Sequence, residues 1–292
     1  MVNRRTFLKT GSVAGGMGLV STINALPNRK QEATTRFGIH EFIENHPDAV
    51  FIMKTNVDTK TNHDAIKDTA HKFGQTVIVP KENGVPIATL VPIKPNLTNV
   101  GFNQTPKDLP QAEAVEYRMG IVTDPWFVEG VIESIKDIGV PADNIWSIET
   151  WHLGNWGPMG YDSMTERTGT HMNDTRETKV DDLPPEKVVW KDVPDGVYFE
   201  KIPYIWPFNA DNTWQLNISK FKTHGMGVTL NCKNIQGTIC HDSRGHCSRS
   251  SITNFEKSTA WTDIENNYNR HVAEGIPRWD RPGTSGGYWM ET

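Results

Sequence analysis

The sequence predicts an α/β protein with a mostly parallel sheet, flanking helices and long irregular insertions. One observation is a strand–helix–strand unit within residues 88–148, where two apolar runs flank an amphipathic helix. Such alternation is typical of parallel sheets, because the helix returns the chain for a second strand in the same direction. A second observation is an apolar run at residues 214–219, followed by a glycine-containing loop and a predicted helix. A third is a long stretch rich in Trp, Gly and Pro that shows no regular period.

Before the clearest helix, the sequence predicts four short elements. Apolar runs bounded by turn residues indicate strands, and helical spacing followed by glycine indicates a helix that ends there. The residues at 82–84 are expected to form a turn between two strands. In chain order the expected elements are a strand at residues 49–53, a helix at 62–73 ended by Gly74, and strands at 76–80 and 88–93.

The clearest helix begins after Thr123. Asp124 can cap its first turn, and Pro125 suits the first helical position, where a missing N–H costs nothing. An apolar stripe at helical spacing follows, and Gly139 ends the helix. Residues 144–148 are the next predicted strand.

The second half of the chain is less regular. Residues 151–210 are expected to form an irregular insertion whose only strand-like piece is 197–202, and loops of this length usually serve a site. After the strand at 214–219 we expect a helix at 228–235 and a weak helix at 251–271.

The N-terminus resembles a twin-arginine export signal. Arg4 and Arg5 precede Phe-Leu-Lys and a weakly apolar stretch with four glycines and no acidic residue. A membrane span needs about 20 mainly apolar residues, so we expect no transmembrane span in the mature chain. Residues 1–30 are therefore interpreted as signal and linker, and 36–292 as a single α/β domain. The expected location is the periplasm or another extracytoplasmic compartment of a bacterium, reached folded through the twin-arginine translocase.

The net charge of the chain limits the classes of partner that the protein is expected to bind. Loss of Arg4, Arg5 and Lys9 with the signal lowers the formal charge from −5 to −8. An acidic protein is poorly suited to neutralise phosphates along nucleic acid, so no nucleic-acid partner is expected. No nucleophile elbow, Walker loop, zinc-protease motif or haem-attachment motif assigns a reaction.

Two polar segments are candidates for binding a small anionic ligand. Ligands of open α/β sheets bind beyond the carboxyl ends of strands, where the first segment is expected. The second segment follows the strand at 214–219, and its glycines and the next helix N-terminus suit an anion. The candidate ligand-binding residues are Lys94, Asn96, Lys220, Lys222, His224, Lys233 and Asn234.

The same second segment carries all three cysteines of the chain. Thiolate and imidazole groups suit a transition metal or an iron–sulfur cluster, with a redox partner. The candidate metal ligands are Cys232, Cys240, Cys247, His241 and His246. The alternative is structural: Cys232 belongs to the core, Cys240 and Cys247 are thiols or a local disulfide, and the histidines are polar loop residues.

Three ordered motifs resemble the domain-of-unknown-function family 362. They are Ile93-Lys94-Pro95-Asn96-Leu97, then Thr123-Asp124-Pro125, then Lys220-Phe-Lys222-Thr-His224 continuing to Lys233-Asn234-Ile235-Gln-Gly237. The resemblance covers about residues 48–250. It implies iron–sulfur association, since many family members are described as iron–sulfur proteins. It also implies a C-terminally shortened member, because family members usually continue further beyond Gly237.

The leading functional hypothesis is therefore an exported protein with a metal- or iron–sulfur-linked redox role. The second is a metal-independent enzyme or binding protein for a small anionic ligand. The third is an inactive interaction module that presents its Trp-rich loops to a partner.

Overall fold

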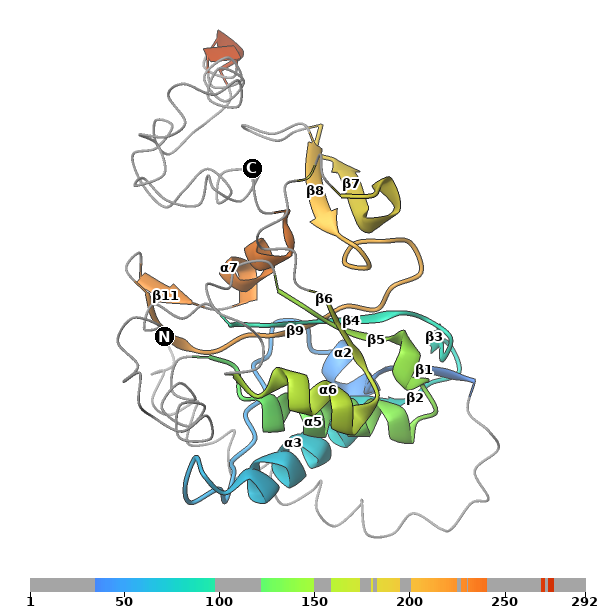
Figure 1. Cartoon of the computed structure of the whole chain (residues 1–292), viewed down its shortest axis with the longest axis vertical. Coiled ribbons are helices and arrows are strands. Elements are labelled where there is room, and N and C mark those ends of the chain that lie inside the picture. Colours follow the sequence, from blue (N-terminus) through green and yellow to red (C-terminus); the bar gives the residue numbers. More distant parts are fainter. Residues whose placement is uncertain are drawn as a thin grey trace. The chain divides into compact units, whose positions relative to one another are not determined.

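A parallel sheet of four strands, in the order β6-β5-β4-β9, forms the centre of the fold (Figure 1). Its strands are β4 (Val91–Pro95), β5 (Ile145–Ile148), β6 (His171–Asn173) and β9 (Leu216–Ile218). All three neighbouring pairs are parallel, which confirms the predicted fold class. The computed structural model describes residues 35–97, 122–149, 159–173, 180, 183–194, 201–224, 227–229, 231–240, 269–270 and 273–275, with the backbone alone at 223–224, 227–229 and 232.

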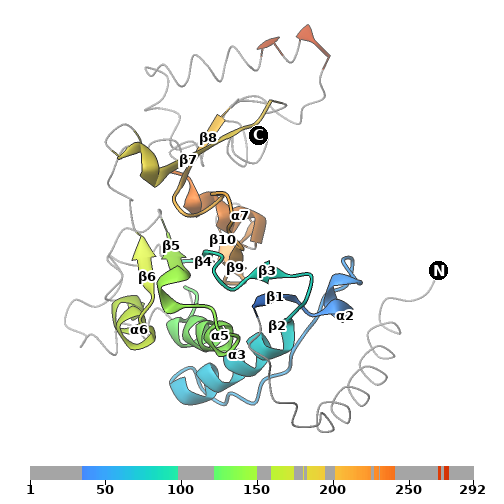
Figure 2. The same ribbon diagram turned by 90° about the vertical axis from the view of Figure 1, so that its right-hand side faces the viewer.

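Three helices cover one face of this sheet: α3 (His63–Val77), α5 (Pro125–Asp137) and α6 (Tyr161–Thr168) (Figures 1 and 2). Val91 and Ile93 of β4 are fully buried in one apolar cluster with residues of these helices. Successive side chains of a strand point to opposite faces, so Lys94, which follows Ile93, points to the other face. Helix α7 (Asn231–Ile235) lies on that other side.

The predicted start of α5 is confirmed. The Asp124 carboxylate accepts hydrogen bonds from the backbone N–H groups of Trp126 (2.8 Å) and Phe127 (3.4 Å), with Pro125 at the first helical turn. The helix ends just before Gly139, whose φ of +105° suits a residue without a side chain. The 3₁₀ helix η2 (Ala142–Asn144) then leads into β5.

Glycines let α3 and α5 pack closely. A Cβ on Gly130 of α5 would overlap the Lys67 carbonyl and lie 2.7 Å from the Ala70 Cβ. Gly74 of α3 faces Ser134 in the same way. The prediction that Gly74 ends its helix is therefore wrong, because this glycine lies inside α3 and its missing side chain makes room for α5.

A second sheet precedes the parallel one. Strand β1 (Arg36–Ile39) pairs antiparallel with β2 (Ile78–Pro80) and β3 (Val85–Pro86), and the short helix α2 (Glu41–Glu44) follows β1. The strand predicted at residues 49–53 is wrong. That apolar run is exposed, and no described strand pairs with it.

The predicted irregular insertion contains regular structure. Besides α6 and β6 it holds the 3₁₀ helix η5 (Pro185–Lys187) and an antiparallel hairpin of β7 (Val188–Asp192) and β8 (Lys201–Ile205). The strand expected at 197–202 overlaps β8 at residues 201–202, and its residues 197–200 lie outside the described part of the chain. These elements are only three to eight residues long, which is too short for a hydrophobic period to be recognised in the sequence.

The segment after β9 also differs from prediction. Residues 222–224 (β10) pair antiparallel with 227–229 (β11), and helix α7 begins only at Asn231. The predicted start of the helix at residue 228 is therefore wrong, because residues 227–229 form a strand that pairs with β10. The 3₁₀ helix η6 (Gln236–Thr238) completes the described segment.

Some predictions fall beyond the described residues. The signal at 1–30 lies there, as does the helix at 251–271 except for residues 269–270, which are helical. Among the described helices, none has the length and apolar character needed to cross a membrane.

Candidate functional site

A buried ion pair lies at the carboxyl edge of the parallel sheet. Lys94 is the next-to-last residue of β4, Glu149 follows β5, and both side chains are only 1% exposed. The Lys94 Nζ donates to the Glu149 Oε2 at 2.8 Å and also to the Pro95 carbonyl. The same carboxylate oxygen accepts the backbone N–H of Leu97 at 3.1 Å. Removing charges from water is costly, and these hydrogen bonds offset that cost.

Asn234 of α7 connects a distant part of the chain to this pair. Its side-chain oxygen accepts from the Lys94 Nζ at 3.3 Å, and its Nδ2 donates to the Lys94 carbonyl at 3.1 Å. Nδ2 also donates to the Oδ1 of Asn217, the residue opposite Lys94 in the register of β4 and β9. Asn217 in turn donates to the Asn231 carbonyl at 2.8 Å. The end of β4, β9 and α7 are therefore joined by one polar network.

Gly237 permits the close approach of the segment after α7. A Cβ at this position would lie 2.5 Å from the Glu149 Oε1 and 2.6 Å from the Lys94 Cε. Real Cβ atoms essentially never come this close. Only glycine therefore fits against the intact Lys94–Glu149 pair.

Further lysines make this edge of the sheet positively charged. Lys222, the first residue of β10, is mostly buried. Burial and the nearby charges of Lys233, Lys94 and Lys220 lower its pKa from 10.5 to about 8, although the Glu149 carboxylate favours its charged form. Lys222 thus lies within electrostatic reach of three other lysines and of the Glu149 carboxylate, and Lys220 lies within reach of the Asp124 carboxylate.

Asp124 and Tyr161 lie beside this cluster. Burial raises the Asp124 pKa, against the opposing effects of its two backbone hydrogen bonds and of Lys220 and His63. Tyr161 of α6 is fully buried, and its hydroxyl donates to the Thr123 carbonyl at 3.1 Å. Burial and the charges of Asp124 and Glu149 raise its pKa well above 10, so its hydroxyl stays protonated.

Asn96 carries an unsatisfied acceptor. Its side chain is 4% exposed, and its Oδ1 accepts no hydrogen bond from any residue that the structure describes. Its backbone is fixed by the Thr123 hydroxyl, which accepts the Asn96 N–H at 2.9 Å and donates to the Ile218 carbonyl. A buried acceptor without a donor is costly, which marks this position as one where a bound hydroxyl, amine or water would be favourable.

The structure brings most of the predicted ligand residues together. Lys94 and Asn234 are in direct contact, and Lys222 lies within electrostatic reach of Lys94, Lys220 and Lys233. His224 ends β10, opposite Gly227, and only its backbone is described. Asn96 follows β4 at the same edge of the sheet.

The predicted metal ligands are only partly described. Cys240 is fully buried in an apolar cluster with Ile148 and Ile205, and its N–H donates to the Pro203 carbonyl at 3.0 Å. Cys232 lies in α7 with its backbone alone described. His241, His246 and Cys247 lie outside the described residues. Within the described part, no three His, Cys, Asp or Glu side chains are grouped to hold a metal ion.

Glu149 is the site residue that the sequence analysis missed. It begins the stretch without regular period, and no motif marks it. One signal could have found it: parallel strands end at the same edge, so the residue after β5 comes close to those after β4.

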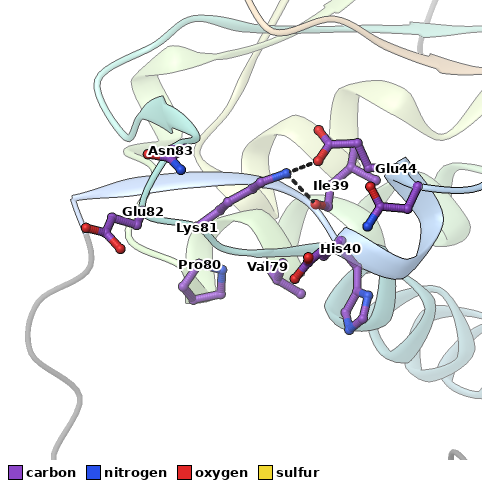
Figure 3. Close-up of a pocket in the computed structure, with 10 residues that line it drawn as sticks. Ile39, His40, Glu44, Val79, Pro80, Lys81, Glu82 and Asn83 are labelled. Atoms are coloured by element: carbon purple, nitrogen blue, oxygen red, sulfur yellow. Dashed lines mark hydrogen bonds and ion pairs between the residues drawn. The ribbon is translucent and has the colours of Figure 1, made fainter.

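Two cavities border on the described residues. One, of about 250 Å³, lies between α3, α5 and β9 and is mainly apolar, with Asn217, Ser219 and Asn231 of the polar network at its wall. The other, of about 870 Å³, lies beside β1, β2 and α2 (Figure 3). There the Lys81 ammonium reaches the Ile39 carbonyl and the Glu44 carboxylate. None of the predicted site residues that the structure describes lines this second cavity.

The sequence model of the domain of unknown function DUF362 matches residues 91–273. The chain belongs to this family. The DUF362 match contains β4 and the whole polar network up to Gly237, whereas β1, α2, α3 and the 870 Å³ cavity precede it. It begins at residue 91 and not near residue 48. No curated protein and no solved structure matches the chain.

Proposed function

We propose that this DUF362 protein binds a small anionic ligand, such as a carboxylate or a phosphate ester, at the carboxyl edge of its parallel sheet. The observation that carries the proposal is the partly buried Lys222, held among Lys94, Lys220 and Lys233. Burial and the positive charges of the neighbouring lysines both disfavour its ammonium form. The negative charge of a bound anion would offset both of these contributions. The affinity for the ligand would therefore come from the Lys222 ammonium, which the fold already holds at this edge of the sheet.

The buried Lys94–Glu149 pair supports the proposal by fixing the site's geometry. Its two members come from adjacent strands, and Asn234 and Gly237 hold α7 against them. The unsatisfied Asn96 oxygen adds a selective element, because a ligand with a hydroxyl group beside its anionic group would donate to it.

The test is a calorimetric titration, in which the heat of binding is measured as inorganic phosphate or citrate is added to the purified protein. Lys222→Ala should abolish binding, whereas Cys232→Ser should leave it unchanged. Lys191→Ala, which removes an exposed lysine of β7, is the matched control for net charge. Loss of binding in Cys232→Ser with retention in Lys222→Ala would reject the proposal.

A metal- or iron–sulfur-linked redox role is the second candidate. It is favoured by the position of Cys240, which packs against Ile148, the residue before Glu149. A cluster bound by the cysteine segment would thus lie next to the polar network. Metal analysis and an absorption spectrum of protein purified without oxygen test this role, and less than about 0.1 equivalent of transition metal contradicts it.

The proposed place of action is outside the cytoplasmic membrane, after export in the folded state. The paired arginines Arg4 and Arg5 support this. Replacing both by lysine should retain the protein in the cytoplasm on cell fractionation, and unchanged export would contradict the proposal.

A further inference from the structure

An exposed apolar segment follows α2 and precedes the family match in the sequence. Its side chains alternate in exposure: Val50 and Ile52 are 85% and 84% exposed, but Phe51 and Met53 only 40% and 37%. A period of two is that of an extended backbone with one face on the protein and the other toward solvent. The segment therefore has the exposure pattern of a strand, although no strand among the described residues pairs with it.

The less exposed face of this segment contacts α2, and its backbone groups are open to hydrogen bonding with a partner strand. The Phe51 ring packs edge-on against Phe42 of α2, with centroids 5.9 Å apart. No backbone hydrogen bond joins residues 50–54 to any other residue that the structure describes. Proteins usually protect such an edge with a proline, a charge or a bulge, and residues 49–53 contain neither proline nor charge.

We propose that residues 48–54 pair antiparallel with the same residues of a second copy of this chain, centred on Phe51. In that register Asp48 of each copy lies opposite Lys54 of the other, and both residues are exposed. Val50 lies opposite Ile52, so the two exposed β-branched side chains cover each other. The free backbone groups form the ladder of hydrogen bonds.

The charge pattern selects a second copy over other partners. The outward face runs acidic, apolar, apolar, basic, which complements itself only when the two strands are antiparallel. Parallel pairing would oppose like charges, and a slip by one residue would turn the two apolar faces to opposite sides. Because a pair of short strands is smaller than a typical stable interface of about 1,200 to 2,000 Å², the dimer should be weak and depend on concentration.

Sedimentation of the full chain over a range of concentrations tests the proposal through charge exchange. With Asp48→Lys alone, a lysine of one copy faces a lysine of the other at each end of the strand pair. With Lys54→Asp alone, two aspartates face each other there. Each should raise the dissociation constant about tenfold. The double variant should restore it, and an equimolar mixture of the two single variants should form heterodimers. Unfolding curves that match the unaltered chain confirm that these exposed substitutions leave the fold intact.

A cysteine at the two-fold axis provides the second measurement. Phe51→Cys should form a disulfide between copies on mild oxidation, whereas Asn56→Cys, which lies away from its counterpart, should not. An unaltered chain that is monomeric at every concentration contradicts the proposal, as do single variants that dimerise normally. Binding of a monomer to phosphatidylcholine vesicles through this segment would assign it to a membrane and reject the dimer.

Discussion

Lys94 and Glu149 form an ion pair that water scarcely reaches. A buried pair of this kind adds little net stability over an apolar pair, but the loss of one member leaves an unpaired buried charge. Its value to this protein is therefore positional: it fixes where β4, β5 and α7 meet.

Glu149→Gln should lower the free energy of unfolding by about 3 to 5 kcal/mol, because the buried Lys94 ammonium loses the carboxylate it pairs with. Adding Lys94→Met should recover part of this loss. Glu133→Gln, in the partly exposed pair with Lys136, is the control and should change stability by less than about 0.5 kcal/mol. Urea unfolding measures all three variants. Unchanged stability of Glu149→Gln would contradict the buried pair.

At the scale of single residues, the sequence predicts Lys94, Lys222 and Asn234 because motifs mark them. It does not predict Glu149 or Asn217, whose roles follow from the pairing of strands far apart in the chain. The sequence also does not predict the raised pKa of Tyr161, because α6 lies in a stretch without a recognisable hydrophobic period.

Helix α5 was predictable from local signals, but its packing partner was not. The Asp124 cap, Pro125 and the apolar stripe define the helix, whereas the close approach to α3 depends on Gly74 and Gly130 lying at the crossing. Other elements depended on tertiary context in the same way. Residues 227–229 pair with β10 and so do not join the helix that follows.

Gly130→Ala should destabilise the protein by about 1 to 3 kcal/mol, because the new methyl group meets the backbone of α3, which cannot move aside. This clash should outweigh the gain of about 1 kcal/mol in helix propensity. Thermal and urea unfolding measure the difference. Lys72→Ala, on the exposed face of α3, should stay within about 0.5 kcal/mol of the unaltered protein. Stabilisation by Gly130→Ala would show that the helices lie further apart.

At the scale of the whole molecule, the parallel order of the sheet explains why the site exists. Strands that run in the same direction end at the same edge, so segments near residues 94, 149 and 218 meet there. Helix α7 then adds Asn234 from later in the chain. The α/β class and this edge follow from sequence patterns, but the antiparallel β1–β2–β3 sheet does not. The strand at 76–80 is predicted, whereas β1 and β3 are too short to be recognised.

The pH dependence of anion binding tests the central claim most directly. Lys222 has its pKa lowered to about 8, so it is charged below that pH and loses its proton as the pH rises. An anion prefers the charged form. Binding of inorganic phosphate or citrate should therefore weaken about tenfold from about pH 7 to about pH 9.

Calorimetry at both pH values, on the unaltered chain and on Lys222→Arg, is the measurement. Arginine stays charged throughout this range, so Lys222→Arg should bind with an affinity that hardly changes with pH. The same fall in affinity in both proteins, or binding that does not depend on residue 222, would contradict an anion site built around Lys222.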